Sequence, residues 1–243
     1  MRAPAGAPDA MPGLLQRPRV AVVIPTLNEE EPIGQVIGAI PRAVVDEVIV
    51  VDSGSEDRTV ERARAAGAQV LIERQRGYGR ACAAGARAAR DCAVIVFIDG
   101  DGSDRPELVP SLLAPILAGT HDFVLGTRTR GQREPGSMNF QQLFAGRLAG
   151  LLISLLYGVR YTDMCPFRAI RPQTLANLGM REQTYGWNLE MQMRAAKNGL
   201  RILEIPVNHR CRAGGVSKVS GTLRGTFVAG ARILATLLHV AME

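Results

Sequence analysis

A unit recurs through the first half of the sequence: a short apolar run stops at a polar loop, and a stretch with helical spacing follows. The runs predict strands at residues 19–24, 47–51, 69–72, 93–98 and 122–125. Nearly continuous apolar runs are typical of parallel strands that are covered on both faces. Because strands and helices alternate, we expect an α/β fold, a single domain with a mostly parallel central sheet flanked by helices. A length of 243 residues suits one such domain.

The rest of the sequence predicts where this domain begins and ends. Residues 1–17, rich in Pro, Ala and Gly, are expected to form a flexible N-terminal tail. The domain itself is expected over residues 18–220, and residues 221–243 are expected to form a C-terminal amphipathic or apolar helix. Helices inside the domain are predicted at residues 30–40, 57–66, 80–90, 106–117, 139–157, 174–178 and 188–197, and two further strands at 167–170 and 201–205.

Polar loops directly follow four of the predicted strands, at Pro25–Glu29, Asp52–Asp57, Asp99–Asp104 and Thr127–Arg128. Ligands of open α/β sheets bind outside the carboxyl ends of the strands, so we expect these loops to form one site. Asp52 ends a strand there, where its carboxylate could accept hydrogen bonds from a base or a ribose. Asp57 is expected to be a helix N-cap.

The sharpest chemical signal is Asp99-Gly100-Asp101, which places two carboxylates at the end of the fourth strand. Mg²⁺ and Mn²⁺ prefer oxygen ligands, and Mg²⁺ is usually held by one or two carboxylates together with substrate phosphates. An acidic turn by itself is more often an ordinary helix start. Its position on the rim shared by the other loops favours a metal site, so we predict that Asp99 and Asp101 hold a divalent cation.

Several other residues give weaker signals. Gly77 and Gly79 could let the backbone approach a nucleotide, but the third glycine of a dinucleotide motif is replaced by Cys82. Arg128, Arg168 and Arg212 are expected in loops, where they could neutralise a diphosphate or could simply be solvated.

Composition and motifs also weigh against other classes. The net charge is +6, but only 5% of residues are aromatic and no basic stripe is interleaved with them, so we expect no nucleic-acid partner. The four cysteines lack C-x-x-C spacing, which argues against a zinc or redox site. The three histidines have no matching nucleophile for a triad, and no P-loop sequence is present.

Together the motifs resemble the signature blocks of family 2 glycosyltransferases of the GT-A fold. The resemblance is closest to the dolichyl- or polyprenyl-phosphate sugar synthases and covers about residues 19–220, in order. The matching blocks are Val22–Glu30, Val50–Thr59, Ile98–Asp101, Asp163–Ala169 and Arg212–Lys218. The blocks depart from the family pattern at Ser53, Ser103, Pro166 and Val216, which stand where Asp, Gln, Gly and Glu are usual.

The resemblance and the residue chemistry together predict roles for individual positions. The residues expected at the nucleotide and its phosphates are Pro25, Asn28, Glu29, Asp52, Gly77, Asp99, Arg168, Arg212 and Ser217. Catalytic roles are expected for Asp101, Arg128, Glu190 and Lys218. The implied cofactor is Mg²⁺ or Mn²⁺.

The reaction expected is transfer of a hexose, with inversion, from a UDP- or GDP-sugar to an acceptor such as polyprenyl or dolichyl phosphate. A phosphate acceptor is already a nucleophilic anion, whereas a hydroxyl acceptor would need a base, for which Glu190 is the candidate. A sugar-nucleotide pyrophosphorylase is a further alternative, although the glycine-rich start of that class is missing. The sequence does not specify the nucleotide, the sugar or the oligomeric state.

Two apolar segments, Leu148–Tyr157 and Thr226–Val240, are expected to touch a membrane surface. Neither is predicted to span it, because the first is short and the second is interrupted by Arg232. The alternative is that the two segments pack on each other. The expected location is therefore the cytoplasm, with peripheral contact at the inner face of the membrane.

Overall fold

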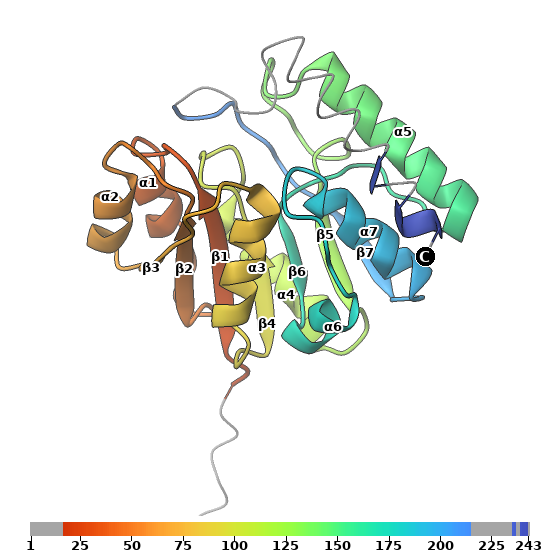
Figure 1. Cartoon of the computed structure of the whole chain (residues 1–243), viewed down its shortest axis with the longest axis horizontal. Coiled ribbons are helices and arrows are strands. Elements are labelled where there is room, and N and C mark those ends of the chain that lie inside the picture. The colour runs from red at the N-terminus through yellow and green to blue at the C-terminus, as the bar shows by residue number, and fades with distance from the viewer. Residues whose placement is uncertain (1–16, 215–234, 237–238, 243) are drawn as a thin grey trace, which may run out of the picture.

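The computed structural model describes residues 17–214, 235–236 and 239–242, which contain a seven-stranded sheet (Figure 1). Its strand order is β3-β2-β1-β4-β6-β5-β7. The strands are β1 (Val20–Thr26), β2 (Glu47–Asp52), β3 (Gln69–Ile72), β4 (Val94–Phe97), β5 (Phe123–Thr127), β6 (Arg168–Ile170) and β7 (Ile202–Pro206). The prediction of an α/β fold with a mostly parallel sheet is confirmed.

One strand breaks the parallel arrangement. β6 pairs antiparallel with both β4 and β5, whereas β5 and β7 pair parallel. On the other side, β1 pairs parallel with β2 and with β4. The chain therefore winds outward in one direction through β2 and β3 and returns to the other side of β1 at β4. The carboxyl ends of β1 and β4 form the switch point at which open α/β sheets bind ligands.

Helices cover both faces of the sheet, as the unbroken apolar strands predict. Alternate residues of β1 point into two separate cores: Ala21 and Val23 into one, and Val20, Val22 and Ile24 into the other. The first core includes residues of α3 (Tyr78–Ala88), α5 (Phe140–Tyr157), α6 (Pro172–Asn177) and α7 (Trp187–Lys197). The second includes residues of α1 (Ile33–Gly38), α2 (Thr59–Ala65) and α4 (Val109–Leu117), which follows the short 3-10 turn η1 (Pro106–Leu108).

The packing of α3 on the sheet leaves no space for a side chain at Gly85. A Cβ atom there would collide with Cγ1 of Val23 in β1 and lie 3.2 Å from Cγ2 of Val51 in β2. The glycine lets the helix backbone approach two central strands closely. This contact fixes α3, and with it Tyr78 at the first turn of the helix, relative to the loops at the carboxyl ends of those strands.

Local signals also define where α5 begins and ends. Asn139 is the N-cap, and its Oδ1 accepts a hydrogen bond from the Gln142 amide at 2.8 Å while Gln142 Oε1 accepts one from the Asn139 amide at 3.0 Å. This reciprocal arrangement is a capping box. Gly158 ends the helix with a φ of 72°, a left-handed conformation that glycine adopts without a steric penalty.

Candidate active site

The loops after β1, β2 and β4 meet at the switch point, and hydrogen bonds brace the first two against each other. The Ser55 hydroxyl lies 2.8 Å from the Asn28 amide, and Asn28 Oδ1 accepts from the Glu56 amide at 2.9 Å. Asn28 has a φ of 53°, in the left-handed region that Asn tolerates better than most residues. The Glu29 amide donates to Thr59 Oγ1 at 2.8 Å. The two loops therefore form one rigid wall.

Asp52 organises this wall from inside. Its carboxylate is 2% exposed, and Oδ2 accepts from the amides of Gly54 and Ser55 at 3.0 and 2.9 Å. Oδ1 accepts from the Ser55 hydroxyl. A bound base would meet a carboxylate already oriented by its own loop. Pro25, also assigned to the nucleotide, is buried within β1 in register with Val51.

Asp57 differs from the prediction of an N-cap, because Arg58 occupies that position and makes no side-chain cap. The Asp57 carboxylate instead accepts from the amides of Thr59 at 3.0 Å and Glu30 at 3.2 Å. The second bond joins the loop after β2 to the loop after β1. Burial alone would raise the pKa of Asp57, but a hydrogen bond from the Thr59 hydroxyl and the two amide bonds hold it below its ordinary value.

The Asp-Gly-Asp turn continues from β4 and holds Asp101 firmly. Asp101 is 7% exposed, and its Oδ1 accepts from the amide and the hydroxyl of Ser103 at 3.0 and 2.6 Å. Gly102 between them has a φ of 77°, a conformation that favours glycine. Ser103, where the family resemblance would place glutamine, therefore orients the carboxylate of Asp101.

Negative charge is crowded in this turn. Burial raises the pKa of Asp99 well above its ordinary value, and the charges of Asp101 and Asp104 add to the effect. Burial and Asp101 likewise raise the pKa of Asp104 to about 7. His209 Nδ1 lies 3.8 Å from Asp104 Oδ1, but burial lowers the pKa of His209 to about 4, so the imidazole is neutral near pH 7 and supplies no balancing charge. The Tyr78 hydroxyl donates to Asp99 Oδ1 at 3.2 Å.

This donor set fits a divalent cation that shares its coordination with a phosphate ligand. The carboxylates of Asp99 and Asp101 would supply the oxygen ligands that such ions prefer, and added positive charge would relieve their crowding. Among the described residues, no group of three or more His, Cys, Asp or Glu side chains could hold a metal ion by itself. Oxygens from a bound diphosphate would complete the shell.

Arg212 is the predicted phosphate-binding residue that reaches this turn. Its Nη1 donates to Asp101 Oδ2 and its Nη2 donates to Glu29 Oε1, both at 2.7 Å. The backbone next to Arg212 also contacts the turn, because the Ala213 amide donates to the Asp101 carbonyl at 3.0 Å. Arg212 therefore joins the loops after β1 and β4 across the switch point.

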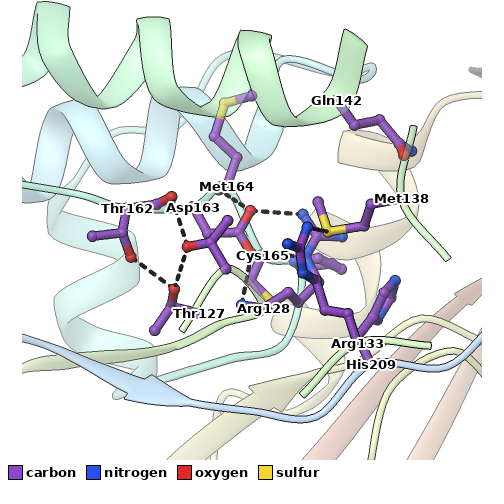
Figure 2. Close-up of polar contacts among 12 residues, drawn as sticks. Thr127, Arg128, Arg133, Met138, Gln142, Thr162, Asp163, Met164, Cys165 and His209 are labelled. Carbon is purple, nitrogen blue, oxygen red and sulfur yellow. Dashed lines mark hydrogen bonds and ion pairs between the residues drawn. The ribbon is translucent and has the colours of Figure 1, made fainter. Parts of the chain in front are cut away.

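Arg128 lies on the rim but is not available as predicted. Its Nε and Nη2 donate to the two carboxylate oxygens of Asp163 at 2.8 Å each, and its own amide donates to Oδ2 at 2.8 Å (Figure 2). Burial alone would raise the pKa of Asp163, but Arg128 holds it below its ordinary value. Nearby, the hydroxyls of Thr127 and Thr162 lie 2.7 Å apart, and Thr162 donates twice to Glu204 at 2.8 Å. The contact between the two threonines ties β5 to the segment before β6.

Arg168 and Glu190 are enclosed by the protein. Arg168 is fully buried, and its guanidinium donates to the carbonyls of Pro166, Cys165 and Asn188. Glu190 is 1% exposed, and its carboxylate accepts from the Arg181 and Glu182 amides at 3.0 and 2.7 Å and from Arg194 Nε at 2.8 Å. In this arrangement both side chains are buried and their polar groups bind other parts of the protein, and the roles expected from the sequence stay predictions.

The glycines at the start of α3 have a packing explanation. A Cβ atom at Gly77 would collide with the Gln183 carbonyl oxygen, and one at Gly79 would lie 2.5 Å from the Glu182 carbonyl oxygen. Close approach of the loop at residues 182–184 therefore accounts for both glycines without a nucleotide. Ser217 and Lys218, the other two predicted site residues, lie outside the described residues.

Sequence reasoning gave no role to Asp163, Tyr78 or His209. Asp163 opens one of the family-like blocks, and an acidic residue at the head of such a block is a usable signal. Tyr78 and His209 reach the acidic turn from positions 21 and 105 residues away from Asp99 and Asp104. No local pattern marks contacts of that kind.

A second surface lies next to this rim and is apolar. The buried residues of α5 are Gly146, Ala149, Gly150 and Ile153, a narrow stripe of mainly small side chains. Most of its large apolar side chains are exposed, namely Phe140, Phe144, Leu148, Leu151, Leu155 and Leu156, whereas Ile153 packs into the core. By length and composition α5 is a candidate for a membrane span, with 22% of it buried in the protein. Figure 1 shows the helix outside β5 and α7.

A mostly parallel sheet with an Asp-Gly-Asp turn at its switch point is typical of glycosyltransferases of the GT-A type. The match to known sequences agrees, because residues 21–185 fit the model of glycosyl transferase family 2. The chain belongs to this family.

Relatives and solved structures support the assignment along most of the chain. A dolichyl-phosphate hexose transferase of Haloferax volcanii is 37% identical over 92% of this chain and 94% of its own length. An undecaprenyl-phosphate mannosyltransferase of Micrococcus luteus is 34% identical over 86% and 91%. The crystal structure of glucosyl-3-phosphoglycerate synthase from Mycobacterium tuberculosis with Mn²⁺, UDP-glucose and phosphoglyceric acid superposes with a TM-score of 0.74. It is 26% identical and covers 93% of this chain and 80% of that one.

Proposed function

We propose that this glycosyltransferase moves a hexose from a UDP- or GDP-sugar to polyprenyl phosphate, with inversion at the anomeric carbon and with Mg²⁺ or Mn²⁺ bound at Asp99 and Asp101. The observation that carries the proposal is the combination of the crowded acidic turn at residues 99–104 with the exposed apolar face of α5, the helix in the connection between β5 and β6. The first suits a metal-bound diphosphate, and the second suits a lipid. Two relatives are named as transferases to lipid phosphates, dolichyl phosphate and undecaprenyl phosphate, and these names support the same acceptor.

The protein's part in this reaction is to bind and position. A divalent cation would neutralise the charge that develops on the departing nucleoside diphosphate. Asp52 and the braced loops after β1 and β2 would hold the nucleotide, and Arg212 would add a guanidinium to its phosphates. A phosphate oxygen of the acceptor would attack the anomeric carbon from the opposite face as the bond to the diphosphate breaks. Such catalysis depends mainly on orientation.

An anionic nucleophile needs no general base, and the surroundings of Glu190 support this choice of acceptor. Its carboxylate is already used by two amides and Arg194. A hydroxyl acceptor would need a base elsewhere among the residues of the site. A pyrophosphorylase reaction gains no support from membership of a glycosyltransferase family.

We further propose that α5 rests on the inner face of the cytoplasmic membrane. Large apolar side chains in the headgroup region would bring the rim next to the lipid phosphate. The other predicted contact, residues 226–240, lies mostly outside the described residues.

The test is turnover with a panel of UDP- and GDP-sugars, Mn²⁺ and polyprenyl phosphate in detergent, followed as release of the nucleoside diphosphate. We expect release from one donor that depends on the lipid phosphate. Phosphoglyceric acid and simple sugars serve as soluble acceptors in parallel. Turnover with a soluble acceptor only would overturn the lipid acceptor, and no turnover with any donor would count against the nucleotide-sugar reaction itself.

A further inference from the structure

Arg212 already contacts one of the two carboxylates that are proposed to hold the metal ion. It contacts Asp101 at Oδ2, while Oδ1 of the same carboxylate is taken by Ser103. The partners are well shielded, with side-chain exposures of 10% for Asp101 and 8% for Glu29 against 29% for Arg212. In this arrangement the guanidinium is the cation in direct contact with the carboxylate.

Arg212 is also incompletely satisfied where it lies. Its Nε is buried, and among the described residues it has no hydrogen-bond partner. A buried donor without an acceptor costs free energy. A diphosphate carries several acceptor oxygens in the geometry that a guanidinium prefers, so it could satisfy Nε and also compensate for the loss of Asp101.

The backbone around Arg212 lies close to the acidic turn. Ala213 donates to the Asp101 carbonyl at 3.0 Å, and Arg210 donates to the Ser103 carbonyl at 2.9 Å. Side-chain movement of Arg212 therefore needs no displacement of the segment that carries it. The guanidinium can leave Asp101 while the backbone contact persists.

We infer that Arg212 is a stand-in cation that competes with the divalent metal for Asp101 and is released when a nucleoside diphosphate binds. The inference rests on the proposed metal site. It implies that metal and nucleotide favour each other's binding, because the nucleotide removes the competitor and the metal removes the partner of Arg212. Such coupling is reciprocal and usually amounts to about 5–150-fold in affinity.

The experiment measures Mn²⁺ binding to the full-length protein without nucleotide, by the electron paramagnetic resonance signal of free Mn²⁺. Arg212→Ala and Arg212→Gln are compared with wild type. Arg201→Ala is the matched control, because it also removes a paired guanidinium. Arg201 contacts Asp122 at 2.6 Å, and these two residues directly precede β7 and β5, at the ends of the strands where each begins. Thermal unfolding of each variant shows that it is folded, and the Gln variant keeps the test open if the Ala variant does not fold.

We expect both Arg212 variants to bind Mn²⁺ roughly tenfold more tightly than wild type, while Arg201→Ala binds as wild type does. Addition of UDP or GDP should tighten Mn²⁺ binding in wild type much more than in the Arg212 variants. Equal or weaker Mn²⁺ binding in the Arg212 variants would overturn the competition, because removal of a residue that merely supports the site leaves Mn²⁺ affinity unchanged or lowers it.

Asp101→Asn separates this result from failure of the proposed metal site. Loss of Mn²⁺ binding in Asp101→Asn, with no gain in the Arg212 variants, would refute the competition and keep the metal at the turn. Unchanged Mn²⁺ binding in Asp101→Asn would refute both.

Discussion

Two arginine–aspartate pairs lie at the carboxyl ends of the strands, and they differ in how fully each arginine is used. Arg128 is held by Asp163 through three hydrogen bonds of 2.8 Å, two from the guanidinium and one from the backbone amide. Arg212 is divided between Asp101 and Glu29, and its Nε has no partner among the described residues. We call the Arg128–Asp163 pair saturated because four hydrogen bonds reach the Asp163 carboxylate, three from Arg128 and one from the Met164 amide; such a buried pair maintains the fold. A divided pair that leaves a donor unsatisfied can exchange partners, and this distinguishes a binding site from a structural contact.

The largest effect should come from breaking the saturated pair. Arg128→Met leaves Asp163, whose side chain is 3% exposed, without its countercharge. We expect the free energy of unfolding to fall by about 3–5 kcal/mol, measured by urea denaturation. Arg212→Met should cost less, because the Arg212 side chain is 29% exposed against 14% for Arg128, so its ion pairs are more strongly screened by solvent. If Arg128→Met lowered the free energy of unfolding by less than about 1 kcal/mol, the Arg128–Asp163 pair would be no more structural than the Arg212–Asp101 pair.

The next effect concerns the exchangeable pair. Asp101→Asn should lower kcat by about 100-fold or more, the size seen when one group that stabilises developing charge is removed. Stability should change little, because the amide can still accept from Ser103. Turnover close to wild type in Asp101→Asn, with Mn²⁺ saturating, would remove this residue from the chemistry.

Glu190 offers a third test, since by its contacts it belongs with the saturated group. Glu190→Gln should reduce the free energy of unfolding by about 2 kcal/mol, because Arg194 and two backbone amides lose a charged acceptor. The folded fraction should keep its kcat. If kcat collapsed while thermal unfolding stayed unchanged, Glu190 would be a base and the acceptor a hydroxyl.

The sheet could be predicted from the sequence because its information is local. Each strand from β1 to β5 is a short apolar run, and each was predicted within two residues of its observed bounds. The antiparallel direction of β6 was not predicted, because it depends on the path of the chain between β5 and β6, which includes α5. Local spacing does not determine the direction in which a strand returns.

The site divides in the same way. That Glu29, Asp52 and Asp101 lie near one another could be predicted because each ends a strand or lies in the loop after one, and parallel strands bring such positions together. The states of Arg128 and Arg212 depend on partners 35 and 111 residues away. Whether an arginine is buried against an aspartate or faces a ligand is decided by those distant partners, so residue type and loop position could not separate the two.

The outer face of α5 extends the comparison to apolar contacts. The helix buries Gly146, Ala149, Gly150 and Ile153 and exposes six large apolar side chains, so its outer face adds little to stability. Leu155, 74% exposed, is the clearest example. Leu155→Ser should leave thermal unfolding unchanged and weaken binding to anionic liposomes in flotation by roughly tenfold, the value of one buried leucine. Binding that stays at the wild-type level would argue for a protein partner or against this face as the contact.

The smallest effect should come from an exposed pair, Asp122 with Arg201, which calibrates the two buried ones. The Arg201 hydrogen bonds lower the pKa of Asp122 to about 2 from an ordinary 3.8. A lowered folded-state pKa means that the contribution is present above about pH 4 and is lost as the pH falls through about 2. The side chains of Arg201 and Asp122 are 56% and 30% exposed, so solvent screens the pair, and we expect Asp122→Asn to cost only about 0.5 kcal/mol at pH 7. The difference from wild type should shrink with added salt and vanish near pH 2. A difference as large as that of Arg128→Met would mean that burial is not what separates the structural pair from the others.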